Sequence, residues 1–160
     1  MRVSEMMVRT AATCSAEMNL GEVVEVMWKR NCGILPIVNI QSKVTGVITD
    51  RDISVALGTR NRLPGEIKVK DVAGPNLYSC KPEDDVRSAL QTMANAKVRR
   101  LPVISAAGRL EGILSMDDVV LHAETTNRSS EVSAERVVNT LKAVYSPYLP
   151  ETAPNRITVM

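Results

Sequence analysis

Apolar residues recur along this chain with two different periods, and each period predicts one type of element. The apolar residues that follow Asn19 fall on one face of a helix, at spacings of three or four positions. They are Leu20, Val23, Val24, Met27 and Trp28. Asn19 and Glu22 are predicted to form a capping box at the start of this helix, and Gly33 to end it with a positive φ. Two short apolar runs, 34–38 and 44–48, then predict the strands of a hairpin.

A second helix is predicted after the hairpin, with Thr49 as its N-cap and Gly58 as its stop. Before the first helix, residues 3–8 predict a helical turn and residues 11–14 a short buried strand. The predicted order is therefore strand, helix, strand, strand, helix. Because the first helix returns the chain parallel to its first strand, we expect an α/β unit, a small mixed sheet with helices on one face.

The whole pattern then occurs a second time. The stretch 46–52 reappears as 112–118, and both ends differ by 66 positions (112 − 46 and 118 − 52). The same offset carries Cys14 to Cys80 without a gap, and an internal repeat of this kind outweighs local signals. We therefore expect a first unit at 1–58, a linker at 59–68, a second unit at 69–124, and a tail at 125–160 with one helix at about 132–145.

Composition adds limits rather than a function. The chain has 160 residues, of which 44% are hydrophobic and 24% charged, as in an ordinary soluble protein. One unit alone is small for a stable core, so the two units are expected to pack together. A net charge of +2 and 2% aromatic residues argue against a nucleic-acid surface. The sequence contains no apolar run typical of a signal peptide or membrane span, and its three cysteines form no Cys-x-x-Cys motif, which favours a reduced, cytoplasmic protein.

The repeated stretch Gly-x-x-[Thr/Ser]-x-x-Asp supports two interpretations. In the first, Thr49 and Ser115 are helix caps with Asp52 and Asp118 as their partners, and no ligand is involved. In the second, free N–H groups at each helix start form an anion site, while each carboxylate accepts the two hydroxyls of a ribose. Two intact copies at one offset favour nucleotide binding, and the capping interpretation stays open.

Residues 3–123 resemble a pair of CBS domains (cystathionine-β-synthase domains), also called a Bateman module. The resemblance rests on the apolar Leu-Pro strands 34–38 and 100–104, each followed by one copy of the repeated stretch. It is closest to small stand-alone bacterial CBS-pair proteins of the hypoxic-response type. It implies that the units pack sheet to sheet about a pseudo-two-fold axis and form two clefts, which in many members bind adenosine nucleotides. Residues 124–160 lie outside the resemblance.

The resemblance also implies site residues. By this resemblance, the two aspartates of the repeated stretch bind the ribose, and its hydroxyl residues and nearby arginines contact the phosphates. Each short first strand contributes one further hydroxyl side chain to a cleft. The residues are Asp118, Ser115, Arg100, Arg99, Ser79, Asp52, Thr49, Thr13 and Arg51.

The two clefts are expected to differ. In regulatory subunits of AMP-activated kinase, a His-Arg pair before Leu-Pro contacts phosphate, and the matching pair here is Arg99-Arg100. The first unit has Gly33-Ile34 at these positions, so phosphate binding there would need Arg51 or Arg100 to reach across. We therefore expect tighter binding in the cleft built on Arg100, Ser115 and Asp118, and a larger loss of ligand-induced stabilisation from Asp118→Ala than from Asp52→Ala. Alternatively, the arginine pair is a solvated end to a helix.

Other chemistry finds little support in the residues. No phosphate-binding glycine loop, dinucleotide motif or nucleophile elbow is present, so we expect no catalytic site. His122 is the single histidine, which excludes a histidine-rich metal site. Cys14 and Cys80 are predicted to be buried packing residues, and Cys32 is a weak candidate for a reactive thiol.

The sequence thus predicts a non-enzymatic regulatory or sensor module that binds AMP, ADP or ATP and needs no cofactor. The alternative is a ligand-free interaction scaffold that uses the CBS pair for dimerisation. In either case we expect a homodimer, together with an effector protein that the sequence does not identify.

Overall fold

The computed structural model describes residues 1–123 and 132–146, and it contains the predicted unit twice. The first unit consists of α1 (Leu20–Arg30), β1 (Ile34–Val38), β2 (Val44–Thr49) and α2 (Asp50–Arg60). The second consists of α3 (Val86–Ala96), β3 (Arg100–Ile104), β4 (Leu110–Ser115) and α4 (Met116–Leu121), and α5 (Ala134–Tyr145) follows it. Within these described ranges, no helix has the length and apolar run needed to cross a membrane. The remainder of the predicted tail lies outside the described residues.

Each unit has a small mixed sheet, as predicted. The strands β1 and β2 pair antiparallel, and so do β3 and β4. The predicted first strand is reduced to one parallel bridge in each unit, between Cys14 and Ile37 and between Cys80 and Val103. The helix before each hairpin therefore returns the chain parallel to its starting segment, as the order of elements requires.

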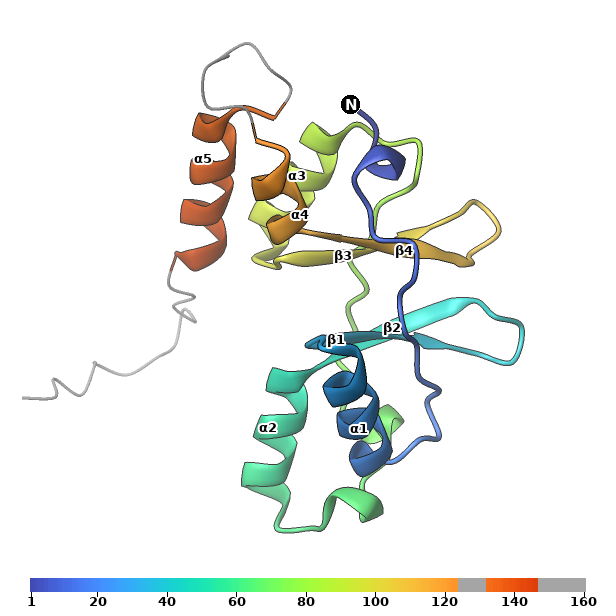
Figure 1. The fold of residues 1–160 in the computed structure, drawn as a ribbon. Helices are drawn as coiled ribbons and strands as arrows, with labels where there is room; N and C mark the ends of the chain where they lie inside the picture. Colours follow the sequence, from blue (N-terminus) through green and yellow to red (C-terminus); the bar gives the residue numbers. More distant parts are fainter. Residues whose placement is uncertain (124–131, 147–160) are drawn as a thin grey trace, which may run out of the picture.

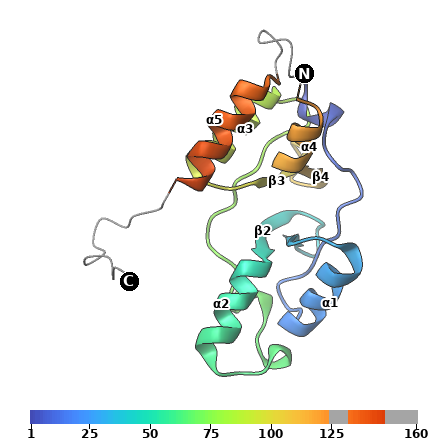
Figure 2. The ribbon, with the colours of Figure 1, turned by 60° about the vertical axis from the view of Figure 1, so that its left-hand side comes forward.

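The two sheets face each other across the middle of the molecule, with the helices on the outer sides (Figures 1 and 2). The hairpin turns are joined directly, because Lys43 pairs with Arg109 and the N–H of Val44 donates to the carbonyl of Gly108 at 2.9 Å. Residues that are far apart in sequence thus lie on either side of the space between the units.

The segment before each unit packs on the other unit. We call the two 3-10 turns Val3–Glu5 and Val69–Asp71 the leading segments. Val3 lies in the core of the second unit and Val69 in that of the first. The N–H of Val3 donates to the carbonyl of Asp84, and that of Val69 to Met18, both at 2.9 Å. The predicted boundaries therefore separate the units along the chain but not in space.

Two glycines predicted to end helices do not do so. Asn31 (φ 48°) ends α1 in the left-handed conformation, and the next N–H, of Cys32, donates to Met27 at 3.0 Å. Gly33 matters for space instead, because a Cβ there would lie 2.7 Å from Asp50 Oδ2. The helix α2 continues through Gly58 and ends at a second left-handed asparagine, Asn61 (φ 48°). Asparagine tolerates this conformation and took the position predicted for glycine.

The helix α5 covers only the second unit. It packs against α3 and α4 (Figure 2), and its Val137, like Val132 just before the helix, belongs to the same core as Leu90. Leu90 is 2% exposed, whereas Val24, its equivalent in the first unit (90 − 66 = 24), is 44% exposed. The outer helical face of the first unit has no such cover among the described residues.

Candidate functional site

The repeated stretch forms the same capping box in both units. The N–H of Asp52 donates to Thr49 Oγ1 at 3.2 Å, and Asp52 Oδ2 accepts from the N–H and hydroxyl of Thr49 at 2.9 and 2.7 Å. For Ser115 and Asp118 the corresponding distances are 3.2, 2.8 and 2.6 Å. The predicted helix caps are therefore confirmed.

The capping boxes still leave acceptors for a ligand. All of these bonds use Oδ2, and Oδ1 of Asp52 and of Asp118 has no hydrogen-bond partner within the described part of the chain. An ionised carboxylate oxygen can accept further hydrogen bonds. Helix capping and ribose binding by one aspartate are thus compatible.

The start of α2 is a poorer anion site than predicted, because its first N–H groups are occupied. The N–H of Asp50 donates to the carbonyl of Gly33 at 3.1 Å and that of Arg51 to Asp50 Oδ1 at 2.8 Å. The third, of Asp52, belongs to the capping box. An anion at this position would depend on side-chain cations for most of its attraction.

A cavity of about 340 Å³, which we call the Asp52 cleft, lies between the units beside this helix start. Its first-unit wall includes Thr49 and Asp52. Its second-unit wall comes from residues 74–78 before α3, from the turn after α3 and from the start of β3. The charged and aromatic residues that line it are Asp50, Arg51, Asp52, Tyr78, Lys97, Arg99 and Arg100. Two carboxylates, those of Asp50 and Asp52, therefore share the cleft with four cations and a ring.

The other motif lines a cavity of about 420 Å³, the Asp118 cleft. Its second-unit wall includes Ser115 and Asp118, and its cations are Arg30 and Arg100. Arg100 thus lines both clefts.

The structure does not group Arg99 with Ser115 and Asp118. Arg99 lines the Asp52 cleft, because the end of α3 and the start of β3 face the β2–α2 junction of the other unit. The predicted cationic pair is therefore divided, with Arg99 in one cleft and Arg100 between the two. The sequence position of Arg99, in the same repeat as Asp118, pointed to the wrong cleft.

The predicted hydroxyl residues Thr13 and Ser79 line neither cleft, whereas Ala12 and Tyr78 do. Side chains alternate along an extended segment, so neighbouring residues face opposite sides. Tyr78 was missed by the sequence reasoning, although an aromatic residue is rare in this chain. Lys97 was also missed, and it enters the cleft because it ends α3 in the left-handed conformation (φ 54°).

Two of the cysteines are packing residues, as predicted. Burial raises the pKa of Cys14 to about 11, and burial with nearby Asp84 raises that of Cys80 to about 12. Both thiols are therefore protonated at neutral pH. Cys32 is half-buried and lines the Asp118 cleft. The described residues contain no group of three or more His, Cys, Asp and Glu side chains that could hold a metal ion.

The sequence profile of the CBS domain matches residues 3–58 and residues 69–124. The chain belongs to the CBS-domain family. The predicted CBS pair is thereby confirmed, and the two matched ranges correspond to the two copies of the repeat.

Several relatives share the pair but differ in length. The CBS domain-containing protein YhcV of Bacillus subtilis is 30% identical over 128 residues, covering 80% of this chain and 89% of that protein. The uncharacterized protein MK0525 of Methanopyrus kandleri is 27% identical over 74% of this chain and 60% of its own length. The inosine-5'-monophosphate dehydrogenase of Methanocaldococcus jannaschii is 29% identical over 74% of this chain and only 23% of its own length. The chain thus spans less than two thirds of the length of some relatives that it matches.

Solved structures have the same fold. Hypoxic Response Protein I, solved with two coordinated zinc ions, has a TM-score of 0.70 and 25% identity, covering 76% of this chain and 98% of that one. The CBS pair of MJ0100, solved with 5-methylthioadenosine and S-adenosyl-L-methionine, has a TM-score of 0.70 and 21% identity over 76% of this chain and 94% of that one. The cytosolic domain of the Mg²⁺ channel MgtE, solved with ATP, has a TM-score of 0.65 and 21% identity over 76% and 48%.

Proposed function

We propose that this CBS pair is a non-enzymatic sensor module that binds an adenosine nucleotide of the AMP, ADP or ATP class in the Asp52 cleft. The observation that carries the proposal is the composition of that cleft, where Asp52 with a free Oδ1 faces Arg51, Lys97, Arg99 and Arg100. Asp52 and Arg51 on one wall, with Lys97, Arg99 and Arg100 on the other, match the ribose and phosphate of a nucleotide.

Each part of the nucleotide has a chemical counterpart in the cleft. Asp52 Oδ1 would accept the ribose hydroxyls, and the guanidinium groups of Arg99 and Arg100 would donate to phosphate, in a bidentate manner where geometry allows. Hydrogen bonds to charged groups contribute about 1.5–3 kcal/mol each. Tyr78 offers a ring face for the base, which is worth about 1–3 kcal/mol per stacked base.

The relatives support the adenosine class. The CBS pair of MJ0100 was solved with two adenosine-containing molecules and the cytosolic domain of MgtE with ATP. We propose the same class for this chain because its fold is the same and its cleft carries the cations that phosphate requires.

We also propose that the Asp52 cleft binds more tightly than the Asp118 cleft, which reverses the order expected from sequence. The Asp52 cleft adds Arg51, Lys97 and Arg99 to the shared Arg100, whereas the Asp118 cleft adds only Arg30. Tyr78 corresponds to Ala12 in the other cleft (78 − 66 = 12), which offers no ring. Both charge and stacking therefore favour the same cleft.

The second candidate, a ligand-free scaffold, draws support from the capping boxes, which are complete without a ligand. In both cases we propose a homodimer. The outer face of the first unit exposes Val24 and Trp28 beside a groove of about 650 Å³, and a second copy would bury this apolar surface. Light scattering that gave a monomer at working concentration would contradict the dimer.

Calorimetric titration with AMP, ADP, ATP and S-adenosylmethionine tests the sensor proposal. We expect binding by the wild type and about ten- to hundredfold weaker binding by Arg99→Ala, from the loss of charged hydrogen bonds. Arg109→Ala is the matched control, because Arg109 is exposed at a hairpin turn and lines neither cleft. Absence of binding with every ligand would reject the sensor and leave the scaffold.

A further inference from the structure

The cations of the Asp52 cleft are already engaged with the last turn of α5. Lys97 Nζ donates to the carbonyl of Ser146 at 3.2 Å. Arg99 Nη1 donates to the hydroxyl of Tyr145 at 3.4 Å, and the Arg99 guanidinium carbon lies 6.0 Å from the centre of the Tyr145 ring. Lys97 and Arg99, which line the cleft, thus also contact the C-terminal end of α5, a helix that lies outside the CBS pair.

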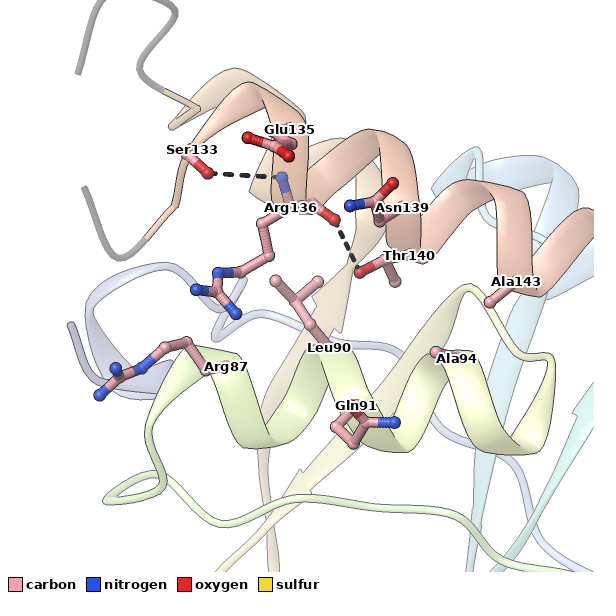
Figure 3. Close-up of a pocket in the computed structure, with 10 residues that line it drawn as sticks. All are labelled: Arg87, Leu90, Gln91, Ala94, Ser133, Glu135, Arg136, Asn139, Thr140 and Ala143. Carbon is pink, nitrogen blue, oxygen red and sulfur yellow. Dashed lines mark hydrogen bonds between the residues drawn. The ribbon is translucent and has the colours of Figure 1, made fainter. Parts of the chain in front are cut away.

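The last turn of α5 is held by these contacts in addition to the packing of α5 on α3. In the groove between the two helices, Leu90 points from α3 toward the middle of α5, near Thr140 (Figure 3). Farther along, the groove is lined by the small residues Ala94 and Ala143. Val137 and Thr140 of the helix itself are buried, and Leu141 and Val144 are partly buried against the same core. Apolar packing therefore runs along α5, and Lys97 and Arg99 add polar contacts at its end.

The partners of these cations in α5 are a hydroxyl, a carbonyl and a ring, none of which carries a net charge. A phosphate would add Coulomb attraction that these neutral groups lack. The helix end does attract cations through its partial negative charge, but only about half an elementary charge is involved. An anion in the cleft should therefore displace the α5 contacts.

We propose that nucleotide phosphate in the Asp52 cleft competes with the last turn of α5 for Lys97 and Arg99, so that nucleotide binding and docking of this turn weaken each other. This inference rests on the proposed function and adds that docking of the last turn of α5 regulates nucleotide binding. By linkage, the coupling acts in both directions, so loosening the helix end must tighten nucleotide binding.

Calorimetry on the full chain with AMP and ATP tests the coupling. Tyr145→Ala removes the ring and hydroxyl that hold Arg99, and its nucleotide affinity should rise about two- to fivefold, the equivalent of one exposed cation–π contact. Tyr145 is exposed, so the variant should fold. Val138→Ala, on an exposed part of the same helix, is the matched control and should bind as the wild type does. In the wild type, hydrogen exchange of residues 140–146 should become faster when nucleotide is added.

The outcomes separate this inference from the proposed function. If the wild type binds no nucleotide, the proposed function fails and the coupling with it. If the wild type binds but Tyr145→Ala has unchanged or weaker affinity, the coupling is rejected while the binding site stands. Equal tightening in Tyr145→Ala and Val138→Ala would also reject it, because general loosening of α5 would then explain the effect. The coupling is also rejected if the hydrogen exchange rates of residues 140–146 do not change when nucleotide binds.

Discussion

The two units share one pattern of residues but have different surroundings. In the second unit α5 lies over α3 and buries Leu90, whereas the equivalent Val24 of the first unit is largely exposed. Trp28 is 86% exposed at the position of Ala94. The two units therefore have the same fold but different outer helical faces. The face of the second unit is covered by a helix of the same chain, and the face of the first unit is available to another molecule.

The inner faces differ in the same way. The capping boxes of Thr49 and Ser115 agree within about 0.1 Å in each bond. The side chains opposite them do not agree, because Lys97 and Arg99 face one cleft while the equivalent positions, Asn31 and Gly33, carry no charge. In the proposed function, the duplicated part of the site positions the ligand, and the part that diverged decides which cleft holds its phosphate.

The largest effect should come from the core beneath α5. Leu90→Ala should lower the free energy of unfolding by about 2–5 kcal/mol, because it removes a fully buried side chain and leaves a cavity. Val24→Ala, at the equivalent but exposed position, should cost less than about 1 kcal/mol. Chemical denaturation of both variants measures the difference. Equal losses would mean that α5 does not cover the second unit in solution.

The next effect compares the two aspartates. Asp52→Ala should remove most of the stabilisation that AMP or ATP gives, corresponding to about 1.5–3 kcal/mol of binding free energy. Asp118→Ala should leave much of it. The measurement is the ligand-induced shift in melting temperature of each variant, relative to the same variant without ligand. A larger loss from Asp118→Ala would restore the order expected from the sequence alone.

Local signals predicted most of the fold, because they depend on neighbours in the chain. Helix periodicity and the capping residues Asn19, Thr49 and Ser115 located the helix starts correctly. Helix ends were less predictable. Asn31 and Asn61 took the left-handed positions that glycines were expected to take, since both residue types tolerate that conformation.

Features that depend on how the units face each other could not be predicted from the sequence. The 66-residue repeat does not indicate whether a leading segment packs on its own unit or on the other unit. For the same reason it placed Arg99 beside Asp118, its neighbour along the chain, rather than beside Asp52, its neighbour in space. The repeat therefore indicated equivalent positions in the two units but not which of them face the same cleft.

A smaller effect tests where the two units should be alike. Without ligand, Thr49→Ala and Ser115→Ala each remove the side-chain acceptor for the N–H of the third helical residue. Each should cost about 1 kcal/mol, within the range of measured N-cap losses. Thermal unfolding of the two ligand-free variants should give similar decreases. A marked difference would show that one capping box is replaced or compensated by other contacts.

The smallest effect concerns the leading segments. Glu17 accepts from Lys68 Nζ at 2.5 Å and Lys70 Nζ at 2.7 Å, joining the second leading segment to the first unit. These two hydrogen bonds lower the pKa of Glu17 from its ordinary value of 4.5 to about 2. Because the pKa is lower in the folded state, the resulting stabilisation is present above pH 4.5 and is lost as the pH falls toward 2.

The other leading segment provides the control. Glu83 is equivalent to Glu17 (83 − 66 = 17), but it forms no ion pair within the described part of the chain. Ser4 stands where the other segment has Lys70, and Arg2, which stands where it has Lys68, forms no ion pair with Glu83. Glu17→Gln should therefore lower stability slightly at pH 6 and not at pH 2, while Glu83→Gln should show no such pH dependence. The effect should be small and should decrease with added salt, because the side chains of Glu17, Lys68 and Lys70 are all exposed. Equal pH dependence in both variants would show that the two leading segments are held alike.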